Sequence, residues 1–325
     1  MNIRIILLFI WCICSIHTAF AQISFTSFYT KDGKETKNPE EAHYYRKMSL
    51  AENSQVQVIE KYIENNKTKL IGTFPSFKDR IFIGQKLQAY EDGKIKSKEF
   101  FSHDGILIDT ALYYHPTGKL RIAYQYPYKT EKNATTVTDT LILAYNDSLG
   151  NRTLFNGNGY AELLSSNNTI ERGNFENHKK TGKWSGEFMN NKYTFEETYD
   201  NGKLISGYSK DFSNNEIPYN NSNFMTPPEY PNGINALRLF VANSYQYPRE
   251  AIQNRVKGTV NVSFIINQEG QMVDMKVEED LGYGTGAEAL RVLKRAKKWT
   301  PGIMRGVPVR VAYSFPIRLD LTSLR

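Results

Sequence analysis

The residues best suited to chemistry by type and spacing form a glycine-rich segment, Gly282-Tyr283-Gly284-Thr285-Gly286. A loop of this kind between a strand and a helix can bind the pyrophosphate of a dinucleotide. Here, however, the preceding strand has one charged face and belongs to a hairpin rather than to a parallel sheet. The acidic run at 278–280 would also repel a pyrophosphate. The segment therefore does not predict a dinucleotide site.

Other side chains that could act in catalysis or metal binding lack a useful spacing. The five histidines are His17, His43, His103, His115 and His178, and none is at the spacing of metal ligands. The sequence contains no nucleophile elbow and no zinc-protease helix motif. Nothing in it pairs two carboxylates as acid and base. We therefore expect no enzyme activity, no catalytic residue, no metal site and no cofactor.

Composition narrows the class of protein further. Both cysteines, Cys12 and Cys14, lie in the apolar N-terminal segment, so the rest of the chain has neither disulfides nor cysteine metal sites. With 40% hydrophobic and 13% aromatic residues, the chain is expected to fold and to be rich in β-structure. Its net charge of +7 owes much to cations at 291–298, which suit the end of a helix. No aromatic residues alternate with these cations, so a nucleic-acid partner is not expected.

Three stretches near the C-terminus alternate apolar and polar residues with the period of a half-buried strand. Residues 259–267 and 273–278 flank Gly270 and predict an antiparallel hairpin. The third stretch, from Val309 to Leu319, has six apolar residues at period two. These patterns predict a three-stranded antiparallel sheet.

Helix signals lie between these strands. A short helix is expected over about 234–244, and a second one begins near Pro248, which suits a first helical turn. A third follows Thr285, which has the capping-box spacing to Glu288. The C-terminal part is therefore predicted to be an α+β domain, a three-stranded sheet packed with helices, that follows a mostly antiparallel β-repeat region.

Pro316 indicates where the last strand lies in its sheet. Proline donates no backbone hydrogen bond, so within a sheet it is confined to an edge strand, a strand start or a bulge. We interpret the strand as an edge whose outward backbone groups are free for a guest strand. A proline-marked edge without any function is the alternative. The residues expected to bind a partner strand are Arg310, Val311, Ala312, Tyr313, Ser314, Phe315 and Arg318.

A series of short motifs runs through the same elements. In chain order the motif residues are Tyr247, Pro248, Gly258, Gly270, Trp299 and Pro301. Together with the final strand they resemble the TonB C-terminal domain family over about residues 227–321. The resemblance implies a periplasmic protein of Gram-negative bacteria that pairs by strand addition with the TonB box of outer-membrane transporters. It also implies ExbB and ExbD as inner-membrane partners if the chain is membrane-anchored.

The N-terminus predicts export. Arg4 precedes the apolar run 5–16, and Ala19-Phe20-Ala21 has the small-x-small form of a signal cleavage site before Gln22. We expect residues 1–21 to be a cleaved signal peptide, which leaves a periplasmic protein. An uncleaved segment would instead anchor the chain in the inner membrane, although the apolar run is short for a span.

The middle of the chain contains a degenerate repeat. Turn units recur between short aromatic and β-branched runs, at Asp92-Gly93-Lys94, Asp104-Gly105, Thr117-Gly118-Lys119, Thr181-Gly182-Lys183 and Asn201-Gly202-Lys203. These units resemble MORN-like repeats. The expected organisation is a β-rich lead-in at 22–78, MORN-like β-hairpins at 79–212, a polar linker at 213–226 and the TonB C-terminal-like domain at 227–325.

Two hypotheses about function follow. In the first, the protein supports TonB-dependent transport by adding a transporter's TonB box to its edge strand. In the second, it is a non-energising scaffold of the cell envelope that acts through its β-repeats. A transducer of this family has a proline-rich spacer, which residues 22–225 lack. We expect the β-repeats to replace that spacer in part.

Overall fold

The computed structural model describes residues 23–165 and 168–320 of the chain. Contacts divide the chain into two compact units, Met1–Arg152 and Thr153–Arg325, and each is described separately. The expected signal peptide lies outside the described residues. Within the described ranges, no helix has the length and apolarity that a membrane crossing requires.

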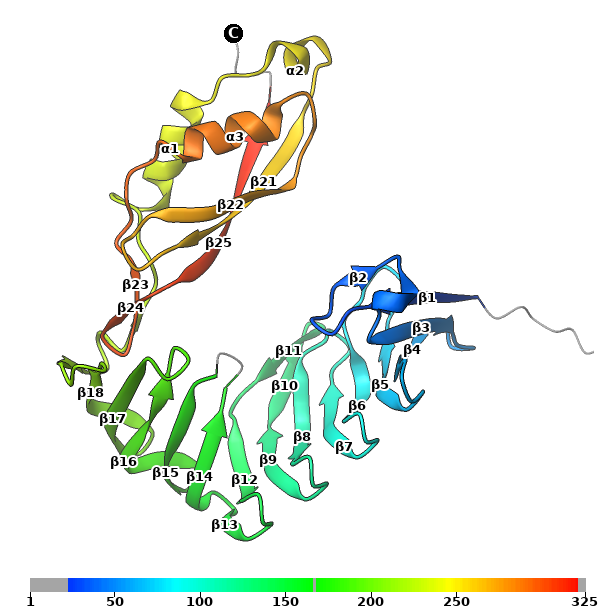
Figure 1. Ribbon diagram of the computed structural model, residues 1–325, viewed down its shortest axis with the longest axis vertical. Helices are drawn as coiled ribbons and strands as arrows, with labels where there is room; N and C mark the ends of the chain where they lie inside the picture. Colours follow the sequence, from blue (N-terminus) through cyan, green and yellow to red (C-terminus); the bar gives the residue numbers. More distant parts are fainter. Residues whose placement is uncertain (1–22, 166–167, 321–325) are drawn as a thin grey trace, which may run out of the picture. The chain divides into compact units, whose positions relative to one another are not determined.

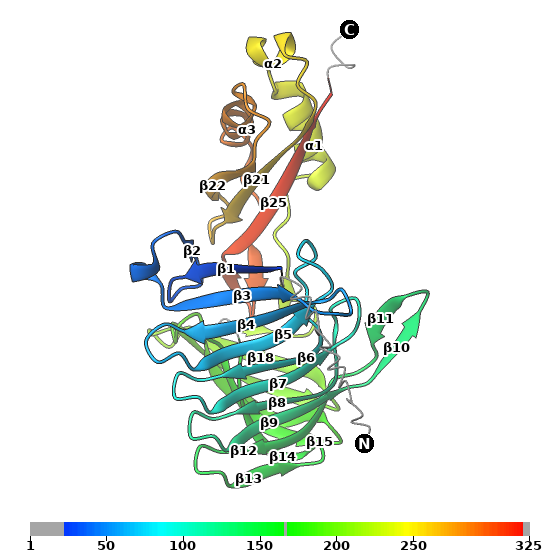
Figure 2. The same cartoon turned by 90° about the vertical axis from the view of Figure 1, so that its right-hand side faces the viewer.

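The first unit is an antiparallel β-meander (Figures 1 and 2). Its strand order is β2-β1-β3-β4-β5-β6-β7-β8-β9-β12, and the hairpin of β10 and β11 projects from the sheet (Figure 2). A short 3₁₀ helix covers Pro39–Glu41. The strands are β1 Ser24–Tyr29, β2 Glu35–Thr36, β3 Tyr44–Leu50, β4 Val56–Tyr62, β5 Thr68–Phe74, β6 Ile83–Ala89, β7 Ile95–Phe101, β8 Leu107–Tyr114, β9 Leu120–Tyr126, β10 Tyr128–Glu131, β11 Ala134–Val137 and β12 Leu141–Asn146.

Alternation of buried and exposed residues explains these strands. In β4, Val56, Val58 and Tyr62 face the interior together with Glu60, which is only 1% exposed. A buried carboxylate needs a charged partner, and Arg46 and Lys69 both form ion pairs with Glu60. The interior of this sheet therefore holds paired charges as well as apolar side chains.

Lysine side chains connect successive turns of the first unit. Each lysine lies against the glycine of the following turn and donates its ammonium group to a carbonyl oxygen of that turn. The pairs are Lys67 Nζ to Asp92 O at 2.8 Å, Lys94 Nζ to Pro116 O at 3.3 Å and Lys119 Nζ to Leu149 O at 2.5 Å. The glycines, Gly93, Gly118 and Gly150, all have positive φ, and a Cβ there would approach the lysine stem. This lysine ladder explains why glycine and lysine recur together in the turns.

The second unit begins with a seven-stranded antiparallel sheet in chain order, β13 to β19. Its strands are β13 Arg152–Phe155, β14 Asn158–Leu164, β15 Ile170–Glu176, β16 Lys179–Phe188, β17 Tyr193–Asp200, β18 Lys203–Lys210 and β19 Glu216–Tyr219. The turn expected at Thr181-Gly182-Lys183 is wrong, because these residues lie within β16, where Gly182 has a positive φ. The chain instead turns at Asn177 and His178.

The polar segment expected as a linker contains two short strands. β19 pairs with β18, and β20 (Met225–Thr226) pairs with β23 (Gly302–Met304). β23 pairs in turn with β24 (Val307–Val309), so β20, β23 and β24 form a small sheet of their own.

The C-terminal part contains a second small sheet, in the order β22-β21-β25, with helices against one face (Figure 1). Its elements are α1 Ile234–Ser244, α2 Arg249–Gln253, β21 Gly258–Ile266, β22 Met272–Glu279, α3 Thr285–Leu293 and β25 Val311–Leu319. The predicted α+β arrangement of a three-stranded antiparallel sheet with helices is therefore present. Its core is formed by the inward residues of the sheet and by Leu237, Val292, Leu293 and Trp299.

Two predicted helix starts differ from the structure. The N-cap of α3 is Gly284 rather than Thr285. Thr285 Oγ1 does not cap the helix; its single proton has two acceptors within 2.7 Å, Asp280 Oδ1 and Gly282 O. Pro248 is the N-cap of α2, one residue before the helical turn in which it was expected. The capping-box prediction is wrong because no side chain caps α3, and the Glu288 carboxylate accepts hydrogen bonds from Gln246 N and Arg291 instead.

Candidate functional site

β25 lies at an edge of its sheet. Within the described residues it pairs with β21 on one side, and no strand pairs with its other side. The register places Pro316 opposite Asn261 and Ser314 opposite Ser263. The sheet order confirms that β25 is an edge strand, as predicted from Pro316.

Pro316 also fixes which backbone groups of β25 point outward. In an antiparallel pair, alternate residues direct both backbone groups toward the partner strand or away from it. Pro316 has no N–H to give to β21, so the outward set is the one that includes it. The other members of that set within β25 are Ala312, Ser314 and Arg318. Their N–H groups face the open side of the sheet.

The side chains of β25 alternate in the same way. Phe315, Ile317 and Leu319 are buried in the core, whereas Ala312, Ser314, Pro316 and Arg318 are exposed. Val311 and Tyr313 are half-buried, and the Tyr313 ring packs 5.1 Å from Trp299. One face of the strand is thus anchored in the core while its edge stays accessible.

Arg310 lies just outside the edge strand. Val307–Val309 pairs with β23 in the other small sheet, and β25 begins only at Val311, so Arg310 lies between two strands. Its guanidinium forms an ion pair with Asp274 Oδ2 at 2.6 Å, and both side chains are exposed. Arg310 therefore does not contribute to the strand edge.

A groove of about 350 Å³ lies between the end of β25 and α1. β25 contributes residues 315–319 to its lining. From α1 and the segment after it come Arg238, Val241, Ala242, Tyr245 and Tyr247. A guest strand beside β25 would therefore meet an apolar and aromatic wall, with Arg238 and Arg318 supplying positive charge.

Hydrogen bonds of two tyrosines connect the segments that line the groove. Tyr247 Oη accepts a hydrogen bond from Asp320 N at 2.9 Å and donates to Asp320 O at 3.3 Å, which ties the end of β25 to the chain before α2. Tyr245 Oη donates to Thr285 O at 2.9 Å and so links α1 to α3. Burial, with the nearby Glu288 carboxylate, raises the pKa of Tyr245, so it remains protonated and able to donate.

The remaining motif residues support the core rather than the edge. Trp299 is buried, and its backbone N–H donates to Gly270 O at 2.8 Å. A Cβ on Gly270 would lie 1.9 Å from Trp299 O, which explains the need for glycine. Gly258 has φ +143° and lies against Leu281. Pro301 stands directly before β23.

The residues that α1 contributes to the groove were not predicted from the sequence. The apolar residues of α1 were assigned to the core, which is correct for Leu237 and Val241. Arg238, Ala242 and Tyr245 follow one another at i, i+4 and i+7, which is the spacing of a second helix face. That spacing is the signal that could have identified them.

Residues 243–321 match the family model of the Gram-negative bacterial TonB protein C-terminal. The match begins at the end of α1 and includes the whole of β25. TonB C-terminal domains are non-enzymatic and associated with transport, so the match supports a TonB-like role in TonB-dependent transport at the Gram-negative envelope. No curated protein matches the chain. The MORN-like character of the hairpins remains a prediction.

The described ranges contain no group of three histidine, cysteine or acidic residues placed to hold a metal ion. What the site offers is a row of outward backbone groups beside an aromatic wall.

Proposed function

We propose that the C-terminal domain binds the TonB box of outer-membrane transporters as an added strand on β25. The open edge, with Ala312, Ser314 and Arg318 directed outward, is the observation that carries the proposal. Main-chain hydrogen bonds would supply affinity, and side-chain contacts in the groove would supply specificity. The family match over the same residues supports this partner.

Two arginines beside the groove favour guest segments that carry an acidic side chain. Arg238 and Arg318 both line it, and neither forms an ion pair with an acidic side chain among the described residues. An acidic side chain in the guest strand would be attracted to them. We therefore expect guest segments that carry a carboxylate near the α1 end of the groove to bind more tightly.

Replacing Ala312 by proline tests the strand addition directly. Ala312 points outward, so the change removes an N–H that serves the guest and leaves the pairing with β21 intact. Loss of one hydrogen bond is expected to weaken binding of a TonB-box peptide about two- to tenfold, as measured by calorimetry. Ala312→Val is the matched control, because it adds a side chain of similar size and keeps the N–H; it should bind like the wild type.

Hydrogen exchange on the wild-type chain gives a second test. The peptide should protect the amides of Ala312, Ser314 and Arg318, while the amide of Arg310 should exchange as before. Exchange that stays unchanged at saturating peptide, or equal affinity in the proline and valine variants, would remove the proposal.

Cleavage or retention of residues 1–21 decides whether the proposed function includes energy transduction. We expect mass spectrometry of the exported chain to find Gln22 as its first residue, which fits a soluble periplasmic partner of the transporter. Retention of Met1 would instead favour an inner-membrane anchor and partnership with ExbB and ExbD.

A further inference from the structure

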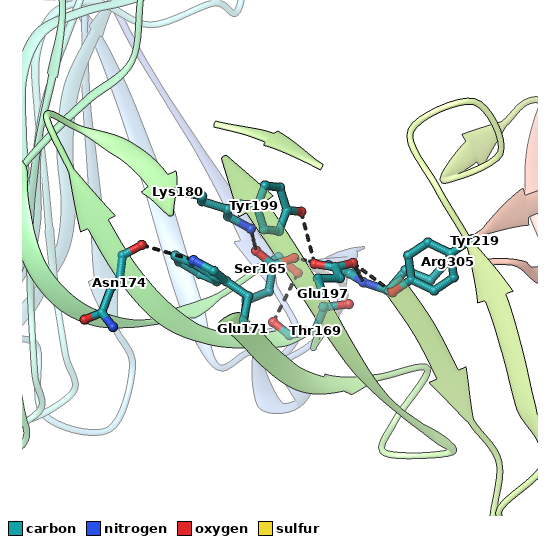
Figure 3. Close-up of polar contacts among 10 residues, drawn as sticks. Ser165, Thr169, Glu171, Asn174, Lys180, Glu197, Tyr199, Tyr219 and Arg305 are labelled. Carbon is teal, nitrogen blue, oxygen red and sulfur yellow. Dashed lines mark hydrogen bonds and ion pairs between the residues drawn. The ribbon is translucent and has the colours of Figure 1, made fainter. Parts of the chain in front are cut away.

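The hairpin of β23 and β24 carries a buried arginine at its tip. Arg305 has φ +52° and is 1% exposed, and its side chain lies among residues of the seven-stranded sheet of the second unit (Figure 3). A guanidinium is removed from water only where carboxylates and hydrogen bonds replace its hydration. The residues around Arg305 therefore form a binding site for this tip.

Two carboxylates from the sheet bind the guanidinium. Arg305 Nε donates to Glu197 Oε1 at 2.8 Å, and Arg305 Nη2 forms an ion pair with Glu171 Oε1. Glu171 also pairs with Lys180 Nζ at 2.7 Å, so two cations balance two anions. Burial acts to raise the pKa of Glu171, but Lys180 and Arg305 outweigh it and hold that pKa below its usual value.

Hydroxyl groups complete the hydrogen bonding around the tip. Tyr219 Oη and Tyr199 Oη donate to the Glu197 carboxylate at 2.9 and 3.0 Å. Ser209 Oγ donates to Arg305 O at 2.8 Å, and Arg305 N donates to Phe224 O at 2.7 Å. The tip is thus held by its backbone as well as by its side chain.

Aromatic rings surround the charged group. The guanidinium carbon lies 3.8 Å from the centre of the Phe195 ring and 5.2 Å from that of Phe224, distances suited to cation–π contact. Val307 of the hairpin packs with Phe188 and Phe195 in one buried cluster. The tip therefore fills a site with both polar and apolar complementarity.

We propose that this hairpin is a plug that fastens the C-terminal domain to the last β-repeats. Only Arg310 separates β24 from β25, so the plug lies next to the edge strand in the chain. If β25 binds a transporter segment as proposed above, a pull on that strand reaches the repeat sheet through the plug, a consequence that rests on the proposed function. The plug itself does not depend on strand addition.

Hydrogen exchange of the full chain, measured without peptide, tests the plug. In Arg305→Met, we expect exchange in residues 302–309 and 224–226 to rise at least tenfold, because two buried carboxylates lose their partner. Exchange in β21 should be unchanged. Arg310→Met is the matched control, since it removes an exposed arginine nearby, and it should leave both segments protected. Wild-type protection of the hairpin in Arg305→Met would overturn the proposal.

A conservative variant covers the case in which Arg305→Met disturbs the whole domain. Arg305→Lys keeps the charge but cannot span both carboxylates with a fork of donors. It should loosen the hairpin segments selectively, and wild-type protection in this variant would also overturn the proposal. Because no peptide is present, a failure of the plug is distinguishable from a failure of peptide binding.

Single-molecule pulling tests the transfer of force. Handles at the C-terminus and at the exposed turn of Asn190 and Asn191 place β25 and the plug in the same load path. The wild type and Arg310→Met should rupture at a higher force than Arg305→Met. Equal rupture forces would show that the plug does not transmit the load.

Discussion

Gly270→Ala is expected to lower the free energy of unfolding of the C-terminal domain by about 3–5 kcal/mol. The added Cβ would lie 1.9 Å from Trp299 O, and the residue must also keep φ +77°. The steric cost arises because Trp299 N donates a hydrogen bond to Gly270 O, which brings the backbone of Trp299 against the turn after β21. The change should therefore displace Trp299 from the core and loosen β21 against its neighbours.

Gly282→Ala is the matched control for this prediction. Gly282 has φ +78°, almost the same as Gly270, but no atom lies within 4 Å of a Cβ built there. It should cost only about 1–2 kcal/mol of backbone strain. Fluorescence of Trp299 during urea unfolding measures both, in a Trp184→Phe background so that one described tryptophan reports. Equal losses in the two variants would contradict the steric explanation.

Trp184→Ala is expected to destabilise the seven-stranded sheet by about 3–5 kcal/mol. Trp184 is 1% exposed, its Nε1 donates to Asn174 O at 3.0 Å, and its ring packs edge-on against Phe175. Lys180 Nζ lies 4.2 Å from the ring centre. Truncation would remove this packing and leave a cavity beside the ion pair of Lys180 and Glu171.

An exposed aromatic provides the comparison for Trp184. Phe212 is 82% exposed, so Phe212→Ala should change stability by no more than about 0.5 kcal/mol. Hydrogen exchange of β15, β16 and β17 measures the repeat sheet, while Trp299 fluorescence follows the C-terminal domain. Similar stability of the two alanine variants would mean that Trp184 is not a core residue of the sheet.

The strands of the C-terminal domain could be predicted because alternation is a local property. Burial on one face produced the period-two pattern of β21, β22 and β25, and Pro316 indicated the edge. The boundary at Arg310 could not be predicted in the same way. Val307 and Val309 continue the alternation of β25, although they pair with a different strand. A change of pairing partner leaves no mark on periodicity.

Other errors have the same origin in local signals. Thr181-Gly182-Lys183 has the composition of a turn, but a glycine with positive φ serves equally at an irregularity within a strand. Thr285 and Glu288 have capping-box spacing, yet Asp280 takes the threonine hydroxyl. In both cases the local composition allows more than one structure.

The proposed binding surface could be predicted only for the strand edge. The sequence placed Ala312, Ser314 and Arg318 on an edge strand, which is where the sheet order has β25, whereas the α1 side of the groove and the buried position of Arg305 were not predicted. Arg305 and Glu197 are 108 positions apart in the chain, so nothing in the local sequence marks that arginine as buried. Its neighbours Gly306 and Pro308 indicate only a turn and an extended segment.

The lysine ladder of the first unit bears on how such a chain can change during evolution. Each lysine requires only a glycine in the next turn of the ladder, and the two inner turns, Gly93-Lys94 and Gly118-Lys119, have both residues. Duplication or deletion of one hairpin between these turns would therefore join two compatible turns without creating an unmatched surface. We expect homologous chains to differ in length by whole hairpins within the lysine ladder, so that they differ in the number of hairpins in the sheet.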